Sequence, residues 1–166
     1  MPQTVEALDH ARAADVPIVV AINKVDRENA SFERTLNALQ ERFGRNAIPI
    51  QIPIGSETEL EGMIDLVTME EWVWAGEDLG ASWEKRPVRD SLKATAEEWR
   101  GKLIEIAVDM DDDVMEAYLE GEEPAIETLK KCIRKGTVDL AFFPTYCGSS
   151  FKNKGLQLIL DAVVDY

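Results

Sequence analysis

The sequence of 166 residues lacks the features that mark membrane proteins and disulfide scaffolds. No apolar run approaches the roughly 20 residues that a membrane-spanning helix needs. The two cysteines, Cys132 and Cys147, show neither the density of a disulfide framework nor metal-ligand spacing, and we expect free, buried thiols. No basic, apolar leader precedes Thr4, so we expect a cytoplasmic location and no membrane association.

Basic residues are also scarce. The chain has 18 lysines and arginines against 32 aspartates and glutamates, which gives a formal net charge of −14. Such a chain repels a phosphate backbone, so we expect no direct nucleic-acid binding. Hydrophobic residues make up 45% of the sequence, which is enough for the core of one ordinary domain or two small ones.

Two motifs of nucleotide-hydrolysing proteins are absent from these 166 residues: G-x-x-x-x-G-K-[ST] and D-x-x-G. The first cradles phosphates in backbone N–H groups and positions magnesium. The nearest segment, Gly101-Lys102, continues with Leu103 inside a helical pattern, and the single histidine, His10, has the spacing of a surface helix residue. We therefore assign no catalytic residue and no metal ligand, and expect no hydrolysis by this chain alone.

The motif Asn23-Lys24-Val25-Asp26 directly follows the apolar run from Ile18 to Ile22, which predicts a buried strand. Guanine presents two adjacent N–H donors, N1–H and N2–H, which one carboxylate such as Asp26 accepts together, whereas adenine has no such pair. Lys24 could cover the base with its aliphatic stem, and Asn23 could tie the turn to neighbouring loops. A solvated turn after a buried strand is the alternative interpretation.

A second strand, loop and helix are predicted near the end of the sequence. The run from Phe142 to Cys147 indicates a strand, Gly148 to Gly155 a polar loop, and Leu156 to Val163 a helix. Ligands of open α/β sheets collect beyond the carboxyl ends of the strands, and small loop residues let backbone N–H groups approach a base carbonyl. The two loops are therefore predicted to meet at one site.

Together, N-K-V-D and C-G-S-S-F-K-N-K-G-L-Q resemble the fourth and fifth guanine-nucleotide motifs of translational GTPases, closest to the elongation factor G branch. The similarity extends through residues 48–55, 62–67 and 118–121, and so covers nearly the whole chain. Ser150 stands where that family usually has alanine. The opening, from Met1 to Ala21, looks more like bacterial initiation factor two.

The resemblance implies GTP or GDP as ligand, with Mg²⁺ expected only in the complete protein. It implies that a complete factor drives ribosomal translocation, and that an insert at this place contacts the ribosomal stalk protein. The guanine-binding residues implied by the matching motifs are Asn23, Lys24, Asp26, Ser149, Ser150 and Phe151.

The expected fold is α/β: the C-terminal part of a P-loop GTPase-type parallel sheet domain with an inserted α+β subdomain. We assign residues 1–46 and 138–166 to the partial GTP-binding domain and 47–137 to the insert. Helices are expected over 4–14, from Ser31 to a C-cap at Gly44, and over 92–110. Alternating isoleucines over 48–54, then 63–67 and 72–74, predict three short strands of the insert.

Two other functions are compatible with the residues. The chain could be a stand-alone acidic protein-interaction module without GTPase activity, or a fragment of an initiation factor two-like GTPase. A non-functional fragment, whose parallel strands lack neighbours, would fold poorly at those edges.

Overall fold

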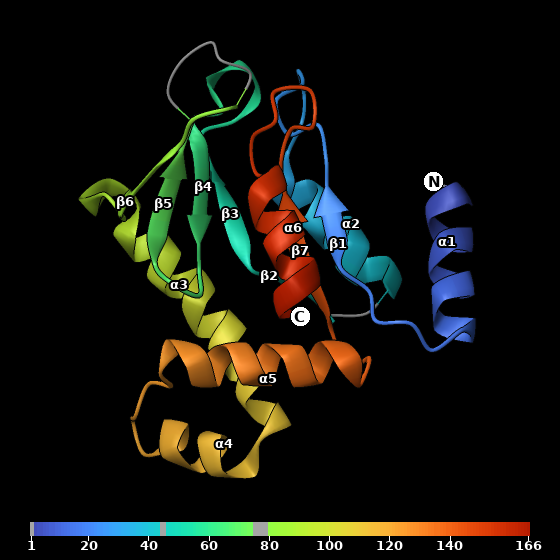
Figure 1. Ribbon diagram of the computed structural model, residues 1–166, viewed down its shortest axis with the longest axis vertical. Helices are drawn as coiled ribbons and strands as arrows, with labels where there is room; N and C mark the ends of the chain where they lie inside the picture. The colour runs from blue at the N-terminus through green and yellow to red at the C-terminus, as the bar shows by residue number, and fades with distance from the viewer. Residues whose placement is uncertain (1, 44–45, 75–79) are drawn as a thin grey trace.

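The computed structural model describes residues 2–43, 46–74 and 80–166, which form two β-sheets side by side with helices around them (Figure 1). The helices are α1 (Pro2–Ala13), α2 (Phe32–Phe43), α3 (Asp90–Ala107), α4 (Asp112–Leu119), α5 (Ile126–Val138) and α6 (Leu156–Asp165), with short 3-10 turns η1 (Glu57–Glu59) and η2 (Val108–Met110). The strands are β1 (Val20–Ile22), β2 (Ala47–Pro49), β3 (Gln51–Ile54), β4 (Gly62–Asp65), β5 (Glu70–Val73), β6 (Glu84–Pro87) and β7 (Phe143–Cys147).

The first sheet has the order β1-β7-β2, and both of its pairings are parallel. All five residues of the central strand β7 are buried, as expected for a strand covered on both faces. In Figure 1, α6 lies in front of this sheet and α2 behind it. The predicted parallel sheet is confirmed.

The second sheet is an antiparallel meander in the order β3-β4-β5-β6. The prediction of one strand over 48–54 was wrong, because the chain changes sheets at Ile50. Ile50 N donates to Thr145 O of the parallel sheet at 3.0 Å, and Ile50 O accepts from Leu66 N beside the antiparallel sheet at 3.0 Å. One residue therefore joins the two sheets, and alternating isoleucines could not reveal this change of partner.

Strand β6 was not predicted, because its sequence Glu-Lys-Arg-Pro is polar and all four residues are exposed. It forms by pairing with β5, from Glu70 opposite Pro87 to Val73 opposite Glu84. An exposed edge strand has no inward apolar face for periodicity to detect.

Helix α3 confirms the predicted long helix but turns a different face inward near its end. Its buried residues are Ala96, Leu103, Ile104 and Ala107, whereas the predicted Ile106 is 36% exposed. The predicted cap Gly44 of α2 lies outside the described residues.

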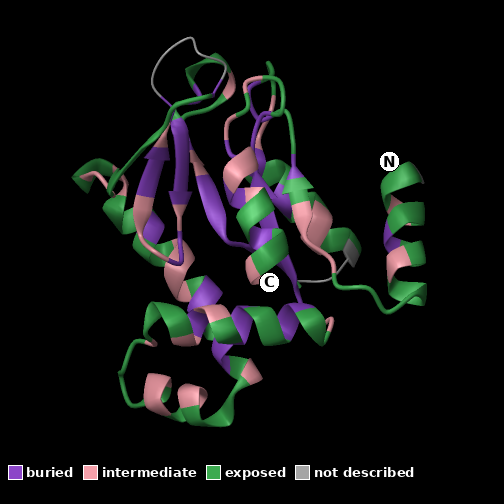
Figure 2. Ribbon diagram, in the orientation of Figure 1, coloured by how far each residue is buried: buried purple, intermediate pink, exposed green. Residues whose placement is uncertain are grey.

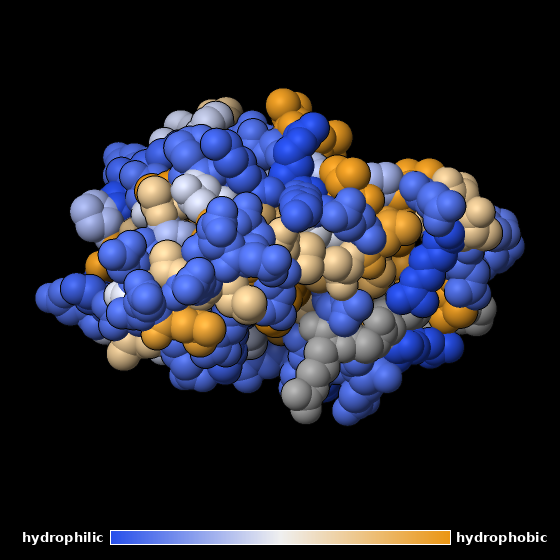
Figure 3. All heavy atoms as spheres, turned by 90° about the horizontal axis from the view of Figure 1, so that it is seen from below, coloured by the Kyte–Doolittle hydropathy of each residue, from blue (hydrophilic) through white to orange (hydrophobic). Residues whose placement is uncertain are grey.

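Seen from the end of the molecule where α4 and α5 lie in Figure 1, the surface is mostly hydrophilic, with separate small apolar patches (Figure 3).

One continuous core joins the two sheets (Figure 2). It includes Ile48 of the parallel sheet, Met63 and Ile64 of the antiparallel sheet, and Ile133 of α5, each at most 1% exposed. Helix α1 is the exception, because it is largely exposed and its buried residue Leu8 is not part of that core, although Arg12 lies over the ring of Phe143 in β7. The site described below therefore rests on a shared core.

Candidate functional site

The loops that follow β1 and β7 lie against each other at one edge of the parallel sheet. Ile22 pairs with Cys147 at the end of both strands, and Gly148 N then donates to Ile22 O at 2.9 Å. Val25 N donates to Gly148 O at 3.3 Å, so hydrogen bonding continues from the strands into the loops. The structure thus brings the two sequence motifs together.

Asn23 links the two loops through its side chain. Its amide oxygen Oδ1 accepts from Lys24 N at 2.8 Å and from Ser150 N at 3.0 Å, across 127 positions of the sequence. Lys24 adopts a φ of +64° and is exposed, so its side chain is available to a ligand. Asn23 therefore holds the shape of the site.

Asp26 has an unusual environment for a carboxylate. The residue is 9% exposed, and its Oδ1 atom is buried without a hydrogen-bond partner among the described residues. The other buried side-chain atoms that share this state belong to neutral amide, hydroxyl and indole groups. A buried carboxylate oxygen without a hydrogen bond is costly, so a ligand that donates N–H groups to Oδ1 would stabilise Asp26.

The loop from Ser149 to Gly155 is a small closed turn. Ser149 N donates to Lys154 O at 2.9 Å, Lys154 N donates back to Ser149 O at 3.1 Å, and Ser149 Oγ accepts from Lys152 N at 3.2 Å. Gly155 has a φ of +83°, and a Cβ there would lie 2.7 Å from Cys147 O. A residue with a side chain would disrupt this turn.

The predicted residues Ser149, Ser150 and Phe151 differ in how far they are exposed to solvent. Ser149 is fully buried, whereas Ser150 is exposed and Phe151 is 78% exposed. The N–H groups of Ser149 and Ser150 already donate to Lys154 O and Asn23 Oδ1. The exposed rim of the loop, at Ser150 and Phe151, is thus the part that a ligand can reach.

Two residues near the site were missed by the sequence analysis. Lys154 Nζ donates to Leu60 O at 2.7 Å, and burial, followed by repulsion from Lys152, lowers the pKa of Lys154. Glu57 Oε1 accepts from Asn29 N at 2.8 Å. The contact partners lie 94 and 28 positions apart, so no local pattern could have identified them.

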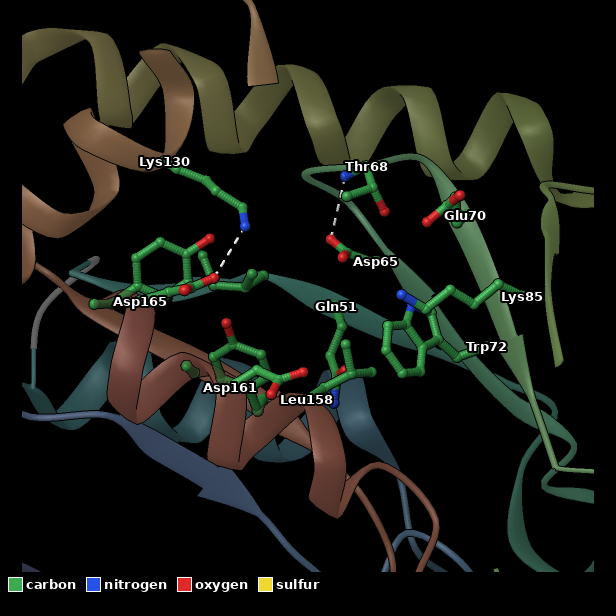
Figure 4. Close-up of a pocket in the computed structure, with 14 residues that line it drawn as sticks. Gln51, Asp65, Thr68, Glu70, Trp72, Lys85, Lys130, Leu158, Asp161 and Asp165 are labelled. Carbon is green, nitrogen blue, oxygen red and sulfur yellow. Dashed lines mark hydrogen bonds and ion pairs between the residues drawn. The ribbon is translucent and has the colours of Figure 1, made fainter. Parts of the chain in front are cut away.

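A separate polar cavity lies between β3, β5 and α6 (Figure 4). Acidic side chains, Lys85 and Lys130 line it together with Trp72, and an ion pair joins Lys130 Nζ to Asp165 Oδ2 at 3.0 Å. Burial raises the pKa of Asp65 there, although N–H groups of Val67 and Thr68 counteract that effect. None of the six predicted guanine-binding residues lines this cavity.

Within 2–43, 46–74 and 80–166, no group of three or more histidine, cysteine, aspartate or glutamate side chains is arranged to hold a metal ion. In the same residues, no helix is both long and apolar enough to cross a bilayer.

Comparison with known proteins agrees with the motifs. The family model described as elongation factor Tu GTP binding domain matches residues 1–166. Elongation factor G of Ruegeria pomeroyi is 57% identical over 165 residues, and that of Hyphomonas neptunium 58% identical over 165 residues. Each alignment covers 99% of this chain but 23% of the relative, so the chain spans under a quarter of their length.

A solved crystal structure of a protein from Thermus thermophilus has the same fold, with a TM-score of 0.84 at 22% identity. The match covers 98% of this chain and 24% of that chain, so it includes residues of both the parallel and the antiparallel sheet. Family model, relatives and fold agree: the chain belongs to the elongation factor Tu GTP-binding domain family.

Proposed function

We propose that this chain is the base-reading part of a translational GTPase and that it binds the guanine of GTP or GDP. The observation that carries the proposal is Asp26, a buried carboxylate with an unpartnered oxygen at the carboxyl end of a parallel strand. The relatives named elongation factor G support this branch of the family over an initiation factor two-like one.

In the proposed complex, Asp26 accepts both N1–H and N2–H of guanine. Lys24 covers the base with its aliphatic stem, and Asn23 keeps the second loop in place through Ser150 N. The guanine carbonyl lies at the rim formed by Ser150 and Phe151, above the buried Ser149. Charge-assisted hydrogen bonds of this kind contribute roughly 1.5–3 kcal/mol each, which is enough to reject adenine.

For the complete protein, we propose GTP-driven ribosomal translocation in the cytoplasm, with Mg²⁺ bound beside the phosphates. The motifs that would hold the phosphates and the metal are not among these 166 residues. We propose the ribosomal stalk protein as a partner of the insert, as the resemblance to elongation factor G implies. The net charge of −14 over the chain is unfavourable for direct contact with RNA.

We keep the expected division into a nucleotide domain over 1–46 and 138–166 and an insert over 47–137, except that its first boundary moves past β2. Strand β2 pairs with β7 in the parallel sheet, so Ala47–Pro49 belongs with the nucleotide side of that boundary. The antiparallel sheet and helices α3 to α5 then make up the insert.

Titration of the 166-residue chain with GDP, followed by ¹⁵N NMR, tests guanine binding directly. We expect the amide NMR signals of loop residues 23–26 and 148–151 to change their chemical shifts with GDP and not with ADP. Asp26→Asn is expected to weaken GDP binding about 10- to 150-fold and to favour xanthosine diphosphate, whose C2 carbonyl oxygen accepts where the N2 amino group of guanine donates.

Asp9→Asn, on the exposed face of α1, is the control for the change in charge. Equal preference for GDP and ADP by the unaltered chain would contradict the proposal. It would favour the second candidate, an acidic protein-interaction module.

A further inference from the structure

The turn that connects β3 to β4 contacts both guanine-reading loops. We call residues 55–61 the β3–β4 turn; it includes η1 and belongs to the antiparallel sheet. In Figure 1 it lies at the same end of the molecule as the loops after β1 and β7. Its contacts cross from one sheet to the site on the other.

Glu57 attaches to the first loop on both sides of Asp26. Its backbone N donates to Val25 O at 3.2 Å, and its side-chain Oε1 accepts from Asn29 N at 2.8 Å. Val25 is buried, and Asn29 has a φ of +62°, so both attachment points have defined backbone geometry. The segment that carries Asp26 is therefore held at both ends by one residue.

Leu60 holds the second loop. Its carbonyl oxygen accepts from Lys154 Nζ at 2.7 Å, and Lys154 is the residue that closes the turn with Ser149. Just beyond the turn, Met63 Sδ lies 3.5 Å from Cys147 Sγ at the end of β7. The same short segment thus contacts the loop of Asp26 and the loop of Ser149.

The β3–β4 turn is itself closed by internal hydrogen bonds. Glu61 N donates to Ile54 O at 2.9 Å and Glu59 N donates to Ser56 O at 3.0 Å. Gly55 has a φ of +78°, and a Cβ there would lie 2.2 Å from Glu59 O. A turn with these internal hydrogen bonds is held in one conformation, so it can restrain the two polar loops that it contacts.

We propose that the β3–β4 turn positions the guanine-reading loops, and that Glu57 is a positioning residue for Asp26. This inference rests on the proposed guanine binding and assigns the antiparallel sheet a part in base recognition. Accepting two N–H donors with one carboxylate requires correct orientation, so loosening the loop weakens guanine binding without any change in the residues that touch the base.

The test compares Glu57→Ala, Glu57→Gln and Glu59→Ala in the 166-residue chain by ¹⁵N NMR titration with GDP. Glu57→Ala is expected to weaken GDP binding about three- to tenfold, because Asn29 N loses its acceptor. Glu57→Gln retains an oxygen acceptor and is expected to bind GDP within about twofold of the unaltered chain. Glu59→Ala removes an exposed charge from the same turn and is expected to change nothing.

Two further readouts separate positioning from general stability. Amide hydrogen exchange is expected to accelerate at Asn29 in Glu57→Ala, while the melting temperature stays close to that of Glu59→Ala. Equal GDP binding by the unaltered chain and by Glu57→Ala would overturn the inference alone. Failure of the unaltered chain to bind GDP would overturn the proposed function and the inference with it.

Discussion

The two sheets of the molecule each carry a buried carboxylate, and they surround it in opposite ways. In the antiparallel sheet, Glu71 is fully buried and accepts from Arg86 Nε at 2.8 Å and from both Nε and backbone N of Arg89 at 2.9 Å. Beside the parallel sheet, Asp26 is almost as buried, but its Oδ1 has no partner among the described residues.

The difference separates a structural carboxylate from one suited to a ligand. Burial alone would raise the pKa of Glu71, but hydrogen bonds from Arg89 and Arg86 outweigh it and the net shift is downward. The protein itself therefore stabilises the charge of Glu71. Among the described residues Asp26 Oδ1 has no comparable arrangement, and Glu57 holds the loop through Val25 O and Asn29 N.

The largest effect is expected from Glu71→Ala. It leaves Arg86 and Arg89 without their shared acceptor, although side chains 44% and 33% exposed retain some solvation. We expect a loss of about 2–3 kcal/mol in the free energy of unfolding, measured by urea denaturation with tryptophan fluorescence. Glu84→Ala, an exposed glutamate of β6, should change it by less than about 0.5 kcal/mol. Similar values for both variants would remove the structural role of Glu71.

Acid should act on the same carboxylate. Since the pKa of Glu71 is lower in the folded than in the unfolded state, its contribution is complete above the unfolded pKa, about 4.3, and is lost as pH falls through the folded pKa. Urea midpoints between pH 6 and pH 3 should therefore fall more steeply for the unaltered chain than for Glu71→Gln. If the urea midpoints of the unaltered chain and of Glu71→Gln fell equally with pH, a lowered pKa of Glu71 in the folded state would be contradicted.

A smaller effect on stability is expected from Asp26→Asn. Removing a buried charge without a partner should leave the free energy of unfolding within about 1 kcal/mol of the unaltered chain, or raise it. The same variant should lose guanine preference. Urea denaturation without nucleotide provides the measurement, and a loss above about 2 kcal/mol would class Asp26 with Glu71 as structural.

The smallest effect is expected from Ser150→Ala. The contact that Ser150 makes with Asn23 uses its backbone N–H, which alanine retains. We expect GDP affinity to change less than about twofold in the NMR titration. Ser150→Pro removes that N–H and should weaken GDP binding more than Ser150→Ala does. Equal GDP affinity of the two variants would contradict a role for the backbone N–H.

Local sequence was sufficient for much of this molecule. Strand β7 and helices α2, α3 and α6 follow from their runs of apolar residues. The prediction of a buried strand from Ile18 to Ile22 was wrong, because β1 spans Val20–Ile22 and only Ile22 of its three residues is buried. Helix α6 buries Leu158 and Ala162, whereas Leu160 and Val163 are 67% and 68% exposed, so periodicity located this helix but not its buried face. Asn23 and Asp26 were predicted to bind a ligand because strand ends in parallel sheets carry ligand-binding loops, and the structure places their loop against residues 148–155.

Other features depend on contacts between distant segments. The change of sheet at Ile50, the exposed strand β6 and the bond from Lys154 to Leu60 join residues without a shared local pattern. The sequence by itself determined the family and the acidic composition and predicted the base-reading residues, because these depend on residue type and short spacing. Only the tertiary structure decided that the turn between β3 and β4 contacts the loops after β1 and β7. It also decided that Asp26 Oδ1 has no hydrogen-bond partner among the described residues while Glu71 is paired with two arginines, because both features depend on which distant atoms meet in the folded chain.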